Sequence, residues 1–159
     1  MIRLIAALDE KRGIGKNGDQ PFYIKTDLAR FRELTMGSPV LMGYGAYKAI
    51  GHPLKGRPTY VASRDPKLSL PGCHIVSDVD SYLKDVKEKG QELWVIGGGQ
   101  MFNLSIGLAS ELYLTEIKGD FDCDAFFPDY HAEFELAGES DWQTEDKLTY
   151  RFTTWRRKG

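Results

Sequence analysis

Leu93-Trp94-Val95-Ile96-Gly97-Gly98-Gly99-Gln100-Met101-Phe102 is the most informative stretch of this 159-residue chain. Its first four residues are all apolar, which predicts a strand buried on both faces. Three glycines end the strand, and residues 100–108 have the spacing of a helix. The apolar face of that helix would carry Met101, Leu104 and Leu108. A buried strand that turns directly into a helix is typical of a parallel sheet covered on both faces.

Strand-like and helix-like runs alternate on both sides of this stretch. We expect strands at residues 2–8, 39–42, 59–63, 74–76 and 112–117, and helices at residues 25–35, 44–50 and 78–89. Residues 9–24 contain turn signals and predict a long loop. The last third alternates with period two, which predicts antiparallel strands closing the sheet. The pattern favours one α/β domain over residues 1–159.

Composition excludes several classes of partner. The net charge of −2 offers no electrostatic basis for binding nucleic acid or an anionic membrane. The apolar opening run at residues 2–8 is too short to span a bilayer and lacks the layout of a cleaved signal. Cys73 and Cys123 stand far apart, which does not describe a disulfide framework or a metal site. We therefore expect a cytoplasmic protein.

The sequence offers no metal site and no nucleophile. His52, His74 and His131 are scattered and make no zinc pattern. The run that begins at Asp120 starts like a calcium loop, but it has Ala125 where glycine is needed and His131 where glutamate is needed. No Ser-His-Asp or Cys-His arrangement is apparent. We predict that no metal takes part.

Asp27 is an acid on an apolar helix face. It directly precedes Leu28, which shares one side of the expected helix with Phe31. Burying a carboxylate is costly without a partner, so such a placement is typical of a functional group. An exposed acid near a helix N-terminus, where the macrodipole favours it, is the simpler interpretation of this segment alone.

Two glycine turns follow expected strands. Gly97-Gly98-Gly99 leads into one helix and Gly43-Tyr44-Gly45-Ala46 leads into another. Backbone N–H groups at such turns suit phosphate, although a tight strand–helix turn explains the glycines equally well. The first turn is not a Rossmann fingerprint, because Phe102 holds the last glycine position. Two turns at one sheet edge indicate an extended ligand with more than one phosphate.

The order of these motifs identifies a family resemblance. The chain resembles dihydrofolate reductases over essentially its whole length, and the joint order of the matching segments is highly specific. They are residues 4–7, 13–18, Pro21 with Asp27, Leu28 and Phe31, then 39–43, 49–57, 95–99, 112–115 and 127–130.

The resemblance implies a fold and an activity. The fold is a single-domain, three-layer α/β structure with a mostly parallel eight-stranded sheet and an antiparallel C-terminal strand. The activity is hydride transfer from NADPH to 7,8-dihydrofolate, giving tetrahydrofolate for one-carbon and thymidylate metabolism. It also implies a monomer that binds antifolate inhibitors.

The resemblance assigns roles on the substrate side. Asp27 would pair with the pteridine ring, Thr115 would support that network, and Phe22 would lie beside the catalytic acid. Arg57 would bind the substrate's glutamate carboxylate, which suits a bidentate guanidinium. The apolar cleft would be lined by Ile5, Ala6, Leu28, Phe31, Ile50, Leu54 and Ile96.

The resemblance assigns a second set of residues to NADPH. Ala7, Ile14 and Gly15 would face the nicotinamide, with Gly18, Gln20 and Ile96 nearby. The phosphates would be held by Gly43, Tyr44, Gly45, Ala46, Gly97, Gly98, Gly99, Gln100, Met101 and Phe102. Ser63 and Arg64 would hold the 2′-phosphate, and Asp124 would latch the loop at residues 9–24. The peptide between Gly97 and Gly98 is cis in this family.

The chain departs from the family pattern at several positions. Phe22 replaces a tryptophan whose indole N–H organises a water, and Gln20 stands where methionine or leucine is common. Tyr44 replaces an arginine near the cofactor phosphates, and Ala46 replaces a threonine. Relatives have either arginine or glutamine at the position of Gln100. These changes bear on cofactor affinity and turnover.

Two alternatives remain open at this point. One is a reductase of the same fold acting on another pteridine or a riboflavin precursor, for which Arg57 would have no use. The other is a non-catalytic folate- or nucleotide-binding protein, which Phe22 and Tyr44 favour.

Overall fold

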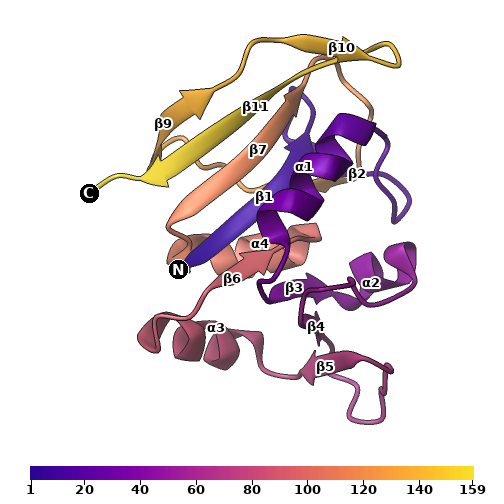
Figure 1. The fold of residues 1–159 in the computed structure, drawn as a ribbon, viewed down its shortest axis with the longest axis vertical. Coiled ribbons are helices and arrows are strands. Elements are labelled where there is room, and N and C mark those ends of the chain that lie inside the picture. The colour runs from indigo at the N-terminus through magenta and orange to yellow at the C-terminus, as the bar shows by residue number, and fades with distance from the viewer.

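Strand β1 lies in the middle of the main sheet. The computed structural model describes all of residues 1–159. The strand order is β10-β11-β7-β1-β6-β3-β4-β5, and β9 also pairs with β11 (Figure 1). The strands are β1 (Ile2–Leu8), β2 (Gly13–Gly15), β3 (Val40–Gly43), β4 (Thr59–Ala62), β5 (Cys73–Val76), β6 (Leu93–Val95), β7 (Glu111–Ile117), β8 (Ala125–Phe126), β9 (Phe134–Glu139), β10 (Gln143–Glu145) and β11 (Leu148–Arg157). The helices are α1 (Lys25–Thr35), α2 (Tyr44–Ile50), α3 (Val79–Glu88), α4 (Gly99–Ser105) and the 3-10 helix η1 (Ile106–Leu108).

The pairing confirms the expected sheet. Strands β7, β1, β6, β3, β4 and β5 run parallel to their neighbours, whereas β11 pairs antiparallel with β7, β9 and β10. The period-two pattern of the last third therefore forms the antiparallel edge, and β9 adds a strand to the eight on the main path. Because the parallel strands share one direction, their carboxyl ends meet at one edge of the sheet.

The two faces of the sheet pack against different helices. On one face, Leu4, Leu112 and Leu114 belong to a core that includes Leu83 of α3 and Phe102 of α4. On the other face, Ile5, Val40, Met42, Val61 and Trp94 form a second core, against which residues of α1 and α2 pack. Neighbouring residues of a strand point to opposite faces, so one apolar strand supplies both cores. The three-layer expectation is confirmed.

Helix α4 packs differently from the sequence expectation. Met101, Phe102 and Ser105 are its buried residues, and Leu104 is exposed. The Ser105 hydroxyl donates to the Met101 carbonyl at 2.6 Å, which satisfies a polar group inside the core. The helix ends at Ser105, and residues 106–108 continue as η1. Of the predicted face, Met101 is buried and Leu108 packs against the same core, whereas the placement of Leu104 was wrong because the helix turns its 101–102–105 side to the sheet.

The expected loop at residues 9–24 contains regular structure. Strand β2 pairs antiparallel with β8, which ties this segment to residues 125–126. Asn17 and Gly18 form a tight turn between Lys16 and Asp19, with φ of 52° and 82°. Asparagine and glycine are the residues that best tolerate two consecutive positive φ values, which explains the Asn-Gly pair at this turn.

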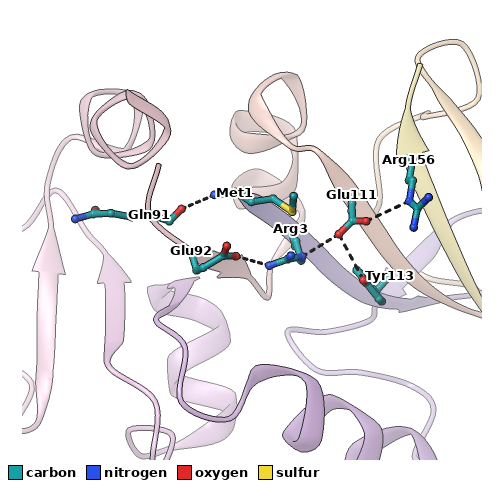
Figure 2. Close-up of polar contacts among 7 residues, drawn as sticks. All are labelled: Met1, Arg3, Gln91, Glu92, Glu111, Tyr113 and Arg156. Carbon is teal, nitrogen blue, oxygen red and sulfur yellow. Dashed lines mark hydrogen bonds and ion pairs between the residues drawn. The ribbon is translucent and has the colours of Figure 1, made fainter. Parts of the chain in front are cut away.

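A charged network lies at the amino ends of the central strands. Arg3 pairs with Glu92 and, at 2.9 Å, with Glu111, which also accepts hydrogen bonds from Tyr113 and Arg156 (Figure 2). These residues join β1, β7 and β11 with the segment before β6. The network lies at the strand ends opposite the edge where the glycine turns gather.

None of the helices has both the length and the apolar character needed to cross a lipid bilayer.

Candidate active site

Asp27 lies in the first turn of α1, and its carboxylate meets β7. The Thr115 hydroxyl donates to Asp27 Oδ1 at 2.5 Å, which joins two residues far apart in sequence. Burial raises the pKa of the Asp27 carboxyl group above its ordinary 3.8, while the Thr115 hydrogen bond and the charge of Arg30 act in the opposite direction. The structure therefore brings together the two polar residues that were predicted to act as a pair.

A small pocket opens beside this carboxylate. It is lined by Ala7, Gln20, Phe22, Tyr23, Ile24, Asp27, Leu28 and Ile117. Five of these were predicted site residues, and they come from the end of β1, the 9–24 segment and α1. Tyr23, Ile24 and Ile117 were not predicted. The alternation of β7 could have indicated Ile117, because it lies two residues after Thr115 on the same strand.

The predicted cleft residues gather on the α1/α2 face of the sheet. Ile5 is buried there, and Phe31, Leu54 and Ile96 pack against the same core, as do Tyr44 and Ala46. Leu28 of α1 lines the pocket beside Asp27, and both Leu28 and Ile50 of α2 are exposed. Aliphatic and aromatic side chains around one acid suit a flat ring with a polar edge.

Ala6 is placed differently from its neighbours. Its side chain packs against the α3/α4 core, on the opposite face of the sheet from Ile5. The reason is the alternation of the strand, which sends successive side chains to opposite faces. Only the main chain of Ala6 can face the cleft, so its predicted side-chain role is corrected.

Arg57 lies near the C-terminal end of α1. Its guanidinium donates to the Lys55 carbonyl at 3.1 Å and to the Thr35 hydroxyl at 3.2 Å, and its Cζ lies 5.9 Å from the centre of the Phe31 ring. Burial and the charge of Arg32 lower the pKa of Arg57. The exposed Arg32 of α1 is thus close enough to act on Arg57, and the sequence had indicated only Arg57 for this site.

The two glycine turns are joined by the backbone. The Gly43 N–H donates to the Gly97 carbonyl at 2.8 Å, which places the ends of β3 and β6 together. Gly97 has φ of 126°, a value that side chains rarely allow, and the Gly97–Gly98 peptide is cis as the resemblance implied. Gly45 and Gly98 each border open space, since an added Cβ would meet nothing within 4 Å. The backbone is therefore accessible at both turns.

The remaining cofactor candidates differ in what they offer. Met101 and Phe102 are buried in the α3/α4 core, so only their backbone can face a ligand. Ile14 belongs to the same core and lies near Gly99, while Gly15 and Gly18 belong to the 13–18 segment. Gln100 is exposed at the start of α4.

Ser63 and Arg64 follow β4 at the same edge of the sheet. The Ser63 hydroxyl accepts a hydrogen bond from the Asp65 N–H at 3.2 Å, and Arg64 is exposed without a hydrogen bond or an ion pair. On α2, the Lys48 ammonium lies 4.9 Å from the centre of the Tyr44 ring. Besides Arg64, Lys48 therefore places a positive charge beside Tyr44, the residue that stands where the family usually has an arginine.

Asp9 is a functional candidate that the sequence interpretation missed. Its carboxylate is buried and accepts backbone hydrogen bonds from Lys11, Gly13 and Phe121 at 2.8–3.0 Å. It thus fastens the start of the 9–24 segment to residues 119–123. Its position directly after an apolar strand is the signal that could have found it.

Asp124 fastens the other end of the same segment. Its carboxylate accepts from the Asn17 N–H at 3.0 Å, and its own N–H donates to the Gly15 carbonyl at 2.9 Å. The implied latch is therefore present as a pair of hydrogen bonds beside Gly15, a predicted nicotinamide neighbour.

This fold and this site define an α/β enzyme in which one carboxyl group faces a cleft beside two open glycine turns. The family model for dihydrofolate reductase matches residues 1–157. The chain is 33% identical over 153 residues to a dihydrofolate reductase of Bacillus subtilis, covering 96% of this chain and 90% of that protein. It is 38% identical over 151 residues to a type 3 dihydrofolate reductase of Salmonella typhimurium, covering 94% and 93%.

A solved structure shows the same fold. Dihydrofolate reductase from Enterococcus faecalis, complexed with NADP(H) and RAB-propyl, superposes with a TM-score of 0.90 at 27% identity. The alignment covers 100% of this chain and 97% of that one. The chain belongs to the dihydrofolate reductase family.

Proposed function

We propose that this chain reduces 7,8-dihydrofolate to 5,6,7,8-tetrahydrofolate with NADPH, supplying one-carbon and thymidylate metabolism. Asp27 is the observation that carries the proposal. It is a carboxyl group held by Thr115 beside a small, mostly apolar pocket. Tyr44 and Ala46, which follow the Gly43 turn, pack against the apolar core on the α1/α2 face of the sheet. This is the activity of the family to which the chain belongs.

Asp27 and Thr115 hold the reacting ring. A carboxyl group pairs with the amidine-like edge of a pteridine through two parallel hydrogen bonds, which fixes the orientation of the ring. NADPH, when bound, supplies the hydride. The protein must also deliver one proton to the ring, and burial that raises the pKa of Asp27 keeps a proton source available nearer neutral pH.

The residues at the glycine turns fit a dinucleotide cofactor. No side chain caps the N-terminus of α2 or of α4, so the first-turn N–H groups are free for phosphate oxygens. Gly45 and Gly98 leave open space beside the backbone. Ala7, Ile14 and Gly15 would hold the nicotinamide end, and Ser63 with Arg64 the 2′-phosphate end.

The cleft fits a folate. Ile5, Phe31 and Leu54 offer apolar contacts to a flat ring system, and Leu28 and Ile50 extend that surface to the rim. Arg57, with Arg32 nearby, places positive charge where a glutamate tail would end. A substrate without carboxylates would leave this charge unused.

A spectrophotometric assay tests the proposal directly. The purified protein is mixed with NADPH and dihydrofolate, and the loss of absorbance of both is followed over time. Turnover of dihydrofolate supports the proposal. If only a riboflavin precursor or a pterin without a glutamate tail is reduced, the chain is a reductase for that substrate instead. Tight binding of both ligands without turnover would show a non-catalytic binding protein.

Phe22→Trp is expected to speed hydride transfer. Phe22 is 5% exposed and packs edge-to-face on Phe121 with ring centres 5.2 Å apart, and it offers no hydrogen-bond donor. An indole N–H at this position would hold a water for the proton route. The gain should stay far below the ~10²–10⁴-fold of a full general acid. Single-turnover kinetics with deuterated NADPH measures it.

The same substitution carries a stability cost. A larger ring in a packed site typically destabilises by about 1–3 kcal/mol, so the melting temperature should fall. A variant that is slower than the wild type, or equal to it, would mean that another group holds the water. Gln20 and Tyr23 line the same pocket and are the candidates.

Arg64→Ala is expected to bring the dissociation constants of NADPH and NADH close together. The backbone of the glycine turns serves both cofactors equally, so discrimination depends on groups at the 2′-phosphate. A charge-assisted hydrogen bond contributes roughly 1.5–3 kcal/mol, about ten- to a hundred-fold in preference. Fluorescence titration of both cofactors measures the change.

Tyr44→Arg is the matched variant in the opposite direction. This variant should bind NADPH more tightly without a matching gain for NADH, and its NADPH affinity should depend more steeply on salt, because the substitution adds a cation. If Arg64→Ala retains a strong NADPH preference, Lys48 becomes the residue that reads the phosphate, since it already lies over Tyr44.

We further propose that residues 1–159 act as a single-domain monomer in the cytoplasm. Both cysteines are free, which suits a reducing compartment. Sedimentation equilibrium of the purified chain tests the monomer, with a dimer mass as the contrary result.

A further inference from the structure

Arg30 is a partly buried arginine that the proposed reaction leaves without a role. It lies on α1 three residues after Asp27, and it makes no hydrogen bond and no ion pair in the structure. Its Cζ lies 4.3 Å from the centre of the Phe152 ring and 5.8 Å from that of Tyr113. The guanidinium is therefore held by aromatic rings rather than by a carboxylate.

The register of the sheet brings this arginine beside the catalytic pair. Phe152 of β11 is the direct partner of Thr115 on β7, and Thr115 donates to Asp27. Side chains three residues apart on a helix are neighbours, with Cβ atoms about 5–6 Å apart. Arg30 thus approaches Asp27 both along the helix and across the sheet.

The other groups around Asp27 leave Arg30 as the relevant charge. On β7, Tyr113 is neutral at physiological pH, because burial raises its pKa further. On β1 and in the 9–24 segment, the pocket beside Asp27 is lined by the uncharged side chains of Ala7, Gln20 and Phe22. At the exposed start of α1, Glu145 of β10 is engaged by Thr26, whose hydroxyl and N–H both donate to its carboxylate.

We propose that Arg30 is a positioning residue for this reaction: seated on Phe152, its fixed positive charge lies beside Asp27 and tunes how readily that carboxyl group releases its proton. Burial favours the neutral acid, whereas the Thr115 hydrogen bond and, after it, the neighbouring cation favour the carboxylate. Arg30 is therefore the charged part of the opposition to burial. A guanidinium suits this task because it stays charged even when partly buried.

The pKa of Asp27 in the ligand-free protein tests the proposal. Carbon-13 labelling of aspartate, with Asp27→Asn to assign the signal, gives this pKa by NMR titration. Arg30→Met keeps the length of the side chain and removes the charge, so the pKa should rise by roughly 0.5–1 unit, less than a contacting ion pair would give. Arg30→Lys, the matched control, should retain most of the wild-type value.

Two further measurements complete the test. The difference between wild type and Arg30→Met should shrink as salt is raised, because the interaction is partly screened. Phe152→Leu removes the ring that holds the guanidinium and should move the pKa of Asp27 in the same direction by a smaller amount. Circular dichroism confirms that each variant is folded.

The proposal rests on the proposed function only for its consequence in catalysis. If the chain reduces dihydrofolate, the upper limb of the pH–rate profile should shift to higher pH in Arg30→Met by the same amount as the pKa. An unchanged pKa of Asp27 in Arg30→Met and Phe152→Leu overturns the role of Arg30, whatever the activity. A shifted pKa without any reductase activity would retain that role and reject the reaction.

Discussion

Asp27→Asn should lose most of its reductase activity at neutral pH, by roughly 10²–10⁴-fold, the range for a positioned acid. The carboxyl group is the polar partner that Thr115 holds in the cleft, and an amide neither supplies a proton nor pairs with the ring edge in the same way. Much of the activity should return at low pH, where dihydrofolate arrives already protonated. Stopped-flow rates across a pH series measure both effects.

The stability of the same variant separates chemistry from folding. The pKa of Asp27 is raised in the folded state, so the folded protein loses stability as pH rises from the unfolded value near 3.8 through the folded value. Asparagine lacks this penalty, and Asp27→Asn should therefore be at least as stable as wild type at neutral pH. Thermal unfolding at pH 4 and pH 7 checks the sign. A near-normal rate at neutral pH would refute the assignment of Asp27.

Arg57→Leu should weaken dihydrofolate binding by roughly 2–4 kcal/mol, the range for removing one partner of a charge pair. Arg57 is held in place by the Thr35 hydroxyl and the Lys55 carbonyl, so its guanidinium is ordered before a substrate arrives. NADPH affinity should stay nearly unchanged, since Arg57 precedes the amino end of β4, whereas the glycine turns follow the carboxyl ends of β3 and β6. Equilibrium titration of both ligands measures the difference.

A pterin without a glutamate tail is the control for this variant. It should bind wild type and Arg57→Leu equally, because it has no carboxylate to lose. Equal losses for both substrates would show that Arg57 supports the fold of the cleft rather than the tail. Arg32→Leu is the matched comparison, and a smaller loss is expected because Arg32 makes no hydrogen bond that orders it.

Strands and helices were predictable from the sequence wherever the pattern of apolar residues alone indicated which side chains are buried. The apolar runs at residues 2–8 and 93–96 became β1 and β6, because a strand buried on both faces has few alternatives. The helix at residues 25–35 also has its predicted bounds. Leu104 shows the limit, because the side of a short helix that meets the sheet depends on the partner that packs on it.

The site divided in the same way. Asp27, Thr115 and the two glycine turns could be named from the sequence and its family resemblance. The interaction of Asp9 with the 119–123 segment could not, because the Phe121 N–H that donates to its carboxylate lies 112 residues away in sequence and only the folded chain brings it there. Ala6 was misplaced because residue type alone does not report the face of the sheet.

The sequence by itself determined the α/β class, the family, and the residue types available for chemistry, since these depend on local patterns and their order along the chain. Only the tertiary structure decided which groups outside α1 act on Asp27. Thr115 donates to it from β7, and Phe152 of β11 holds the guanidinium of Arg30, which is its neighbour along α1. Hydrogen bonding and burial depend on contacts in space, and the packing of α1 on β7 and β11 supplies those contacts.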